Sequence, residues 1–149
     1  MGVAILISIT IDIKLKSIRS DGDGQLILIT GTILQEEVSI LNIYATDMEA
    51  PTYVKETFLE LKAIKPHTLI VGDFNILHLP MDRSFRDKPN REIRELIQVM
   101  NQMDLTDIYR SFHPNRKENS FFSADHGTFS KIDHILGNKA IFHRNKKKY

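Results

Sequence analysis

The fold is decided by the stretch Thr68-Leu69-Ile70-Val71-Gly72-Asp73-Phe74-Asn75, in which a short apolar segment runs into a polar end. We predict a buried strand over Thr68–Val71, and Gly72 after it allows the backbone to approach a neighbouring group closely. Asp73 and Asn75 are two residues apart, so an extended backbone would project both to the same side. A carboxylate beside an amide suits proton transfer next to a polarised phosphoryl oxygen, although a polar turn that closes a strand explains the same residues equally well.

The residues before this stretch predict β structure. Strands are expected over Val3–Ile9, Leu26–Leu34 and Glu37–Tyr44, with a hairpin-type turn at Ser20–Gly24 and a candidate bulge at Gly31. The last of these strands carries apolar residues on both faces, which is typical of a strand buried in a layered core.

Two segments with apolar residues at helical spacing flank the strand over Thr68–Val71. The first is expected to have Thr52 as its cap and to end at Pro66, and the second to begin after the cap Asn90. Further strands are expected over Ser120–Ser123 and Lys131–Leu136. This mixture of hairpins and helices predicts a layered α+β domain.

The amino-acid composition limits which classes of protein this chain can belong to. The 149 residues suit a single domain, and 20 Lys and Arg against 19 Asp and Glu leave no charge excess for a histone-like binder of polyanions. No apolar run approaches the roughly 18 residues of a membrane span, so no membrane partner is expected. The absence of Cys excludes disulfide frameworks, thiolate zinc sites and thiol catalysis, and it fits an intracellular location, in the nucleus or the cytoplasm. The charge is uneven at the end, where a basic tail over 139–149 holds five Lys and Arg and no acid.

Three further positions could carry chemistry, and each has a plainer interpretation. Tyr44 ends its predicted strand, where a phenol can donate to a phosphate or merely cover the core with its hydroxyl in water. Asp107 is more readily a structural carboxylate that caps or braces a loop. Asp133 and His134 are adjacent on a predicted strand and point to opposite faces, so Asp133 cannot orient His134 as a catalytic dyad requires. The remaining histidines show no metal-ligand spacing, which argues against a closed zinc site.

Four motifs taken in order carry a resemblance to a known family. They are Asn42-Ile43-Tyr44-Ala45, Gly72-Asp73-Phe74-Asn75, Leu105-Thr106-Asp107-Ile108-Tyr109-Arg110 and Lys131-Ile132-Asp133-His134-Ile135. Together they resemble the endonuclease/exonuclease/phosphatase superfamily, and most of all the apurinic-type endonuclease domain of a mammalian long interspersed (non-LTR) retrotransposon polyprotein. The resemblance implies a four-layer α/β sandwich, in which two mainly antiparallel β-sheets are flanked by helices, and magnesium-assisted nicking of DNA.

The resemblance also implies roles for individual residues. Tyr44 corresponds to a phenol that contacts the scissile phosphate, and Asp73 to a carboxylate that activates water or protonates the leaving oxygen. Asn75 corresponds to an amide that positions Asp73 and the phosphate, and Asp133 to a carboxylate that pairs with the family's catalytic histidine. We therefore expect these four residues around one cleft, with His134 pointing away from Asp133.

Contacts with DNA are implied for a second group of residues. The segment from Ser120 to Ser130 resembles the hairpin loop that probes the DNA groove in these nucleases. Asp47 stands where the family usually has Asn, and it would bring negative charge to a position that meets phosphate. The candidate DNA-binding residues are Asp47, Ser120, Ser123, His126, Thr128 and Ser130.

The chain departs from the family's pattern at both ends. Two N-terminal strands, which bear a site Asn and the metal-binding Glu, and a C-terminal strand, which bears the catalytic His, have no counterpart in this sequence. We therefore expect a partial sandwich, a single incomplete domain over 1–149, in which the main Mg²⁺ ligands are absent and no metal site is intact. Such a chain is expected to be inactive alone. It should also leave strand edges and apolar side chains such as Ile5, Ile7 and Ile43 uncovered, which favours aggregation.

Two other functions stay open beside a magnesium-dependent DNA-nicking domain. One is a non-catalytic remnant that binds nucleic acid weakly through its basic tail, because point charges need little architecture to meet phosphate. The other is a phosphatase of the same superfamily. The resemblance of the segment from Ser120 to Ser130 to a DNA-probing hairpin favours nucleic acid over an inositol phosphate.

Overall fold

The computed structural model describes residues 2–46, 49–61, 67–76, 90–115, 121–123, 128–130 and 133–138. Its elements in chain order are β1 (Ile13–Ser20), β2 (Leu26–Ile33), β3 (Glu36–Tyr44), α1 (Ala50–Leu61), β4 (Thr68–Asp73), α2 (Arg91–Gln102), β5 (Leu105–Asp107), α3 (Ile108–Phe112), β6 (Phe121–Ser123), β7 (Thr128–Ser130) and β8 (Asp133–Asn138). One six-stranded sheet has the order β1-β2-β3-β4-β8-β5, and β6 pairs with β7 in a separate two-stranded sheet. This arrangement confirms the predicted α+β class.

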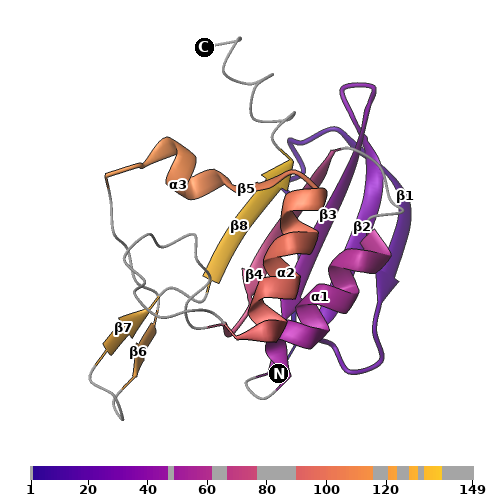
Figure 1. Ribbon diagram of the computed structural model, residues 1–149. Coiled ribbons are helices and arrows are strands. Elements are labelled where there is room, and N and C mark those ends of the chain that lie inside the picture. The colour runs from indigo at the N-terminus through magenta and orange to yellow at the C-terminus, as the bar shows by residue number, and fades with distance from the viewer. Residues whose placement is uncertain are drawn as a thin grey trace.

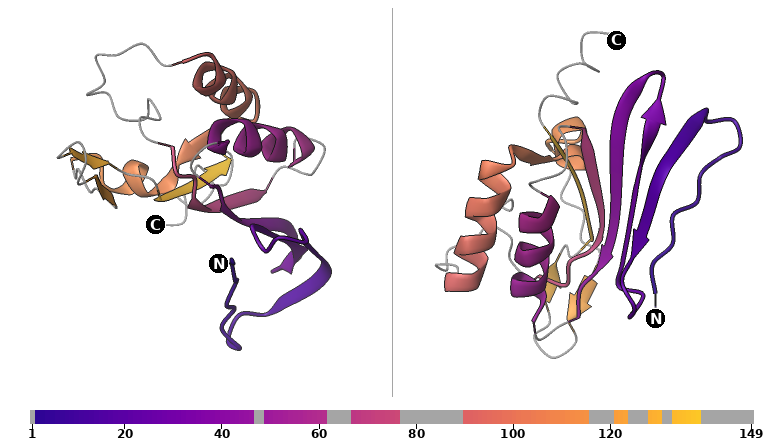
Figure 2. Two further views of the ribbon diagram at one scale, coloured as in Figure 1. Left: turned by 90° about the horizontal axis from the view of Figure 1, so that it is seen from below. Right: turned by 90° about the vertical axis from the view of Figure 1, so that its right-hand side faces the viewer.

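The six-stranded sheet is mainly antiparallel, and helices cover one of its faces. Among the described strand pairs, β3 with β4 alone is parallel. A parallel pair needs a crossover connection, which α1 supplies here because it lies between β3 and β4 in the chain. Figures 1 and 2 show α1 and α2 side by side over the same face of this sheet. The helices and the sheet form two adjoining layers of the expected sandwich.

The first strand begins later than the sequence predicts, and the strand expected over Val3–Ile9 is wrong. That segment forms no strand, although its alternate residues are half-buried. It is held by isolated hydrogen bonds: Val3 N–H donates to the Gly24 carbonyl at 3.0 Å, and Asn42 Nδ2 donates to the Ala4 carbonyl at 2.8 Å. Figure 2 shows this segment on the side of the sheet opposite α1 and α2. A segment lying on a sheet face shows the same alternation as a paired strand, which explains the error.

The hairpin of β2 and β3 confirms the strands predicted over Leu26–Leu34 and Glu37–Tyr44. Leu34 and Gln35 form its two-residue turn, and both have positive φ, at 49° and 66°. This is the backbone that matches the twist of a tight hairpin. The bulge expected at Gly31 lies instead in the facing part of β1, and a Cβ on Gly31 would meet the Lys14 carbonyl oxygen at 2.5 Å. The glycine therefore makes room for the bulge.

Helix α1 begins two residues before Thr52, so the cap predicted there is wrong. Pro51 lies in the first turn of the helix, where a missing N–H leaves no hydrogen bond unmade, and this allows the earlier start. The helix runs to Leu61, and the predicted end at Pro66 lies outside the described residues.

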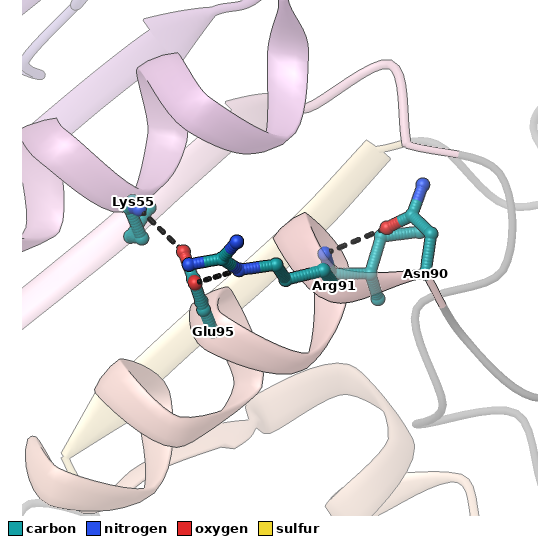
Figure 3. A network of polar contacts seen from close by, with 5 residues as sticks. Lys55, Asn90, Arg91 and Glu95 are labelled. Atoms are coloured by element: carbon teal, nitrogen blue, oxygen red, sulfur yellow. Dashed lines mark hydrogen bonds and ion pairs between the residues drawn. The ribbon is translucent and has the colours of Figure 1, made fainter.

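Helix α2 begins as predicted, with Asn90 as its cap. The Asn90 side chain accepts from Ile93 N–H at 2.9 Å. One turn further on, Glu95 accepts from Lys55 of α1 at 2.8 Å and from Arg91 at 3.0 Å, so a polar bridge joins the two helices (Figure 3). These hydrogen bonds, that from Lys55 first, lower the pKa of the Glu95 carboxyl.

The hydrophobic core lies between the sheet and the helices. Its largest fully buried side chains are Leu41, Ile43, Val54, Phe58, Ile70, Phe74, Leu96 and Leu136. Ile43 was expected to be uncovered, and this is wrong, because it faces α1 and α2. Ile5 and Ile7 are half-buried. None of the helices in the described part of the chain is long and apolar enough to cross a membrane.

Candidate functional site

Three side chains of the predicted site form a row across neighbouring strands. Tyr44 is the last residue of β3 and pairs in register with Asp73, the last residue of β4; Asp73 in turn pairs with Asp133, the first residue of β8. Residues opposite each other in neighbouring strands project to the same face, and in an antiparallel pair their Cβ atoms lie about 4.5–5.5 Å apart. Tyr44, Asp73 and Asp133, termed the site row, therefore meet at one end of the sheet. The register agrees with the expectation that Asp73 and Asp133 lie together, while their roles stay predictions.

Asp73 and Asn75 are close for a different reason from the one predicted. The backbone is not extended after Asp73: Asn75 has a φ of 49°, and its N–H donates to Asp73 Oδ1 at 2.9 Å. An Asp side chain commonly accepts in this way from the N–H two residues on, and Asn tolerates a left-handed backbone better than most residues. The extended geometry expected for this pair is therefore wrong. The turn instead fixes the orientation of the Asp73 carboxylate at the end of β4.

Gly72 allows β3 and β4 to come together at the site row. Its φ is 147°, and a Cβ there would lie 1.9 Å from the Ile43 carbonyl oxygen. Any other residue would push the two strands apart or change the backbone. Directly after this contact, Ala45 N–H donates to the Asp73 carbonyl at 2.9 Å. The close approach predicted for Gly72 is thus confirmed, and it holds Tyr44 beside Asp73.

Asp133 and His134 point to opposite faces of β8, as predicted. Asp133 is exposed on the face that carries the site row, whereas His134 is 5% exposed on the helix side. Asp107 has the structural role predicted for it: it caps α3, with Oδ1 accepting from Arg110 N–H at 3.0 Å. Its other oxygen, Oδ2, lies 3.7 Å from His134 Nδ1.

The buried contact between His134, Phe74 and Asp107 was not predicted. The ring of His134 packs on Phe74 with centroids 5.2 Å apart. Both rings directly follow a carboxylate of the site row in the sequence. The alternation of faces could have suggested that they share the core side, but the pairing of β4 with β8 was needed to bring them together.

The candidate DNA-binding residues fall on a part of the chain that the structure describes incompletely. Asp47, Ser120 and His126, together with the basic tail over 139–149, lie outside the described residues. Ser123 pairs with Thr128, and Phe121 with Ser130, in the hairpin of β6 and β7. The predicted hairpin is therefore formed. Figure 1 shows it at the end of the main sheet where β8 begins, which is the end that carries the site row.

The described residues do not make a metal site by themselves. They contain no group of three or more His, Cys, Asp or Glu residues that could hold a metal ion. Mg²⁺ commonly takes one or two carboxylates together with waters and substrate phosphates, so Asp73 and Asp133 could supply only part of such a shell.

Comparisons with known proteins point to one family. The sequence model of the endonuclease/exonuclease/phosphatase family matches residues 1–148. Among solved structures, the endonuclease domain of TRAS1, a telomere-specific non-LTR retrotransposon, superposes with a TM-score of 0.61 at 11% identity, covering 93% of this chain and 60% of that domain. TDP2 of D. rerio, solved with a single-strand DNA product, gives 0.57 at 10% identity, covering 85% and 53%. TDP2 of Caenorhabditis elegans gives 0.51 at 14%, with the same two coverages. The chain thus shares their fold and spans little more than half the length of these proteins.

Proposed function

The chain belongs to the endonuclease/exonuclease/phosphatase family, and on that premise we propose that the site row is the proton-handling part of a site that cleaves a phosphodiester bond in DNA. The observation that carries the proposal is the register that aligns Tyr44, Asp73 and Asp133 across three strands. Like charges at directly opposite positions destabilise a sheet. A pair of carboxylates placed this way is therefore better explained by chemistry than by packing.

Each member of the site row suits a separate task. The Asp73 carboxylate, whose orientation is fixed by Asn75 N–H, would accept a proton from water or return one to the leaving oxygen. The Tyr44 phenol would donate to a phosphate oxygen, where it opposes the charge that develops during cleavage. Asp133, exposed beside Asp73, would orient a general acid or base. The Asn75 side-chain amide would contact the phosphate next to Asp73.

Two features favour a nucleic acid over a small phosphate ester as substrate. The hairpin of β6 and β7 lies at the same end of the main sheet as the site row, where it could follow a DNA groove (Figure 1). Two of the solved structures with this fold are those of a retrotransposon endonuclease domain and of a TDP2 complexed with single-strand DNA. The finer proposal is a DNA-nicking domain of retrotransposon type that works with Mg²⁺ inside the cell, in the nucleus or the cytoplasm.

We expect this chain alone to cleave DNA at a background rate. It spans 60% of the TRAS1 domain, and the part that the structure describes contains no group of three or more His, Cys, Asp or Glu residues that could hold a metal ion. In reactions of this kind, the residues of a site act as a unit, and the loss of a few members removes most of the rate.

The test is nicking of supercoiled plasmid with Mg²⁺ by this chain and by a longer protein that carries flanking segments of its own reading frame. Nicking by the longer protein that disappears in its Asp73→Asn variant supports the proposal. Salt-sensitive DNA binding without nicking by either protein would instead identify a non-catalytic remnant. Hydrolysis of a small phosphomonoester without nicking would identify a phosphatase. Nicking by the short chain that survives Asp73→Asn would show that other residues do the chemistry.

A further inference from the structure

Two aromatic rings lie directly beneath the site row, on the core side of the sheet. Phe74 follows Asp73 and is fully buried, and His134 follows Asp133 and is 5% exposed. Their ring centroids are 5.2 Å apart, with the planes tilted by 31°. Phe58 of α1 meets Phe74 edge-on at 5.9 Å, which ties this pair to the helix layer. Phe74 directly follows Asp73, and His134 directly follows Asp133. The two rings that follow the carboxylates therefore pack against each other.

Packing alone does not explain why one of these rings is a histidine. Both ring nitrogens of His134 are buried and have no hydrogen-bond partner. Buried polar groups are nearly always paired, and a Phe or Leu would fill the same space without leaving a polar atom unpaired. The polar group that His134 does face is Asp107, with Nδ1 at 3.7 Å from Oδ2 and both side chains at most 5% exposed. This distance is within ion-pair range for a protonated imidazole and slightly longer than a hydrogen bond.

Asp107 is a rigid partner for His134. Its Oδ1 accepts from Arg110 N–H at 3.0 Å, and its carbonyl accepts from the Ser111 hydroxyl at 2.9 Å. Asp107 also pairs with Leu136 in the sheet, two residues along β8 from His134, so the two side chains are diagonal neighbours on the same face. A contact with Asp107 therefore connects β8 to the start of α3.

We propose that His134 is a positioning residue for the carboxylate pair. Its ring, packed on Phe74, would fix β8 against β4, and its Nδ1, 3.7 Å from Asp107 Oδ2, would fix β8 against the cap of α3. Because the backbone of His134 pairs with Gly72, one step from the pair of Asp133 and Asp73, these two contacts set the spacing of the carboxylates. The catalytic meaning of this spacing rests on the proposed function, whereas the positioning itself does not.

The first test uses two variants that keep the shape of the site. His134→Phe keeps a ring on Phe74 and removes the nitrogens, and Asp107→Asn keeps an oxygen that can cap α3 and removes the charge. We expect each variant to speed amide hydrogen exchange about tenfold or more where β4 pairs with β8, while β2 keeps its rate, because only one end of the sheet loosens. The double variant should exchange no faster than either single one. Val99→Ala, a change in the buried face of α2, should leave this end unchanged.

Two results would overturn the proposal. One is unchanged exchange at the β4–β8 end in both single variants, and the other is effects that simply add in the double variant. If His134→Phe does not fold, Asp107→Asn decides alone, because Asn preserves the cap. His134→Asn gives a further check: its side-chain N–H can replace Nδ1, so it should restore slow exchange partly, although it leaves a gap against Phe74.

Activity gives a separate measurement. In the longer protein used to test the proposed function, His134→Phe should lower kcat about 10- to 100-fold with KM unchanged, since small misplacements of reacting groups have effects of this size. Val99→Ala should change neither constant. If no form of the protein nicks DNA, the proposed function fails, and the exchange experiment still decides whether His134 positions the carboxylates. If nicking occurs and kcat is unaffected, the positioning proposal fails alone.

Discussion

The two faces of the main sheet differ in how well they are covered. On the face beneath α1 and α2, Leu41, Ile43 and Leu136 are fully buried. On the opposite face, residues 2–12 supply part of the cover, and Ile135 is 42% exposed. The site row is on this second face, as the exposed Asp133 shows. The covered face therefore gives the sheet its stability, and the open face carries the groups that could do chemistry.

This division has a physical reason. A carboxylate that exchanges protons must reach water or a substrate, so it cannot sit in a dry core. It must also be held in one place, which a packed core one residue away can do. Asp73 followed by Phe74, and Asp133 followed by His134, satisfy both needs, because neighbouring residues along a strand point to opposite faces.

The largest expected effect is on the open face and concerns rate. In a protein that nicks DNA, Asp73→Asn should lower the rate about 10²- to 10⁴-fold, the usual loss for an acid–base group. The Asn oxygen can still accept from Asn75 N–H, so the unfolding free energy should change little. Plasmid nicking and chemical denaturation measure the two quantities. Asp12→Asn removes the same charge just before β1 and should leave the rate unchanged; equal losses in both variants would show a general charge effect.

The second largest effect is on folding stability instead of rate, and it arises on the covered face. Ile43→Ala should lower the unfolding free energy by about 2–5 kcal/mol, because it opens a cavity in the core. Ile135→Ala makes the same chemical change on the open face and should lower it by about 1 kcal/mol or less, since its side chain is 42% exposed. Urea denaturation of both variants checks the difference. Similar losses would mean that the open face is covered in solution.

A third effect concerns solubility. β1 is an edge strand with exposed apolar side chains, Leu15 at 51% and Ile18 at 66%, and such edges favour association. We expect the chain to bind a dye specific for apolar surface and to scatter light at raised concentration. Ile18→Lys should reduce both signals, whereas Ser20→Lys, which adds the same charge without removing apolar surface, should reduce them less. A sharp cooperative melt of a monomeric chain without dye binding would contradict the expectation.

The sequence predicted the parts of the fold that depend on local signals. The alternation in Glu37–Tyr44, the β-branched run Thr68–Val71 and the cap Asn90 each act within a few residues, and each is confirmed. The strand predicted over Val3–Ile9 failed because alternation shows which residues face the protein but not which backbone they pair with.

The candidate site was predictable only as a set of residues. The family's motifs selected Tyr44, Asp73 and Asp133, but no local signal gives the register that aligns them, since β8 lies some sixty residues after β4 in the chain. The contact of His134 with Asp107 depends on the same long-range pairing. It also depends on β5 and α3, which are short and carry weak periodicity.

The smallest expected effect belongs to the bridge between α1 and α2, far from the open face. The hydrogen bonds from Lys55 and then Arg91 lower the pKa of Glu95 below its ordinary value of 4.5. A carboxylate with a lowered folded-state pKa stabilises the fold fully above its unfolded pKa, and the contribution is lost as the pH falls through the folded value. The unfolding free energy of the wild type should therefore exceed that of Glu95→Gln at neutral pH, and the difference should shrink below about pH 4.5. Because these groups are partly exposed, 1 M salt should also reduce this difference.

The control variant is Glu56→Gln, which removes an exposed acid of α1 that forms no ion pair with the described residues, so it should show no such difference. A Glu95 effect that is independent of pH and salt would point to packing instead of charge.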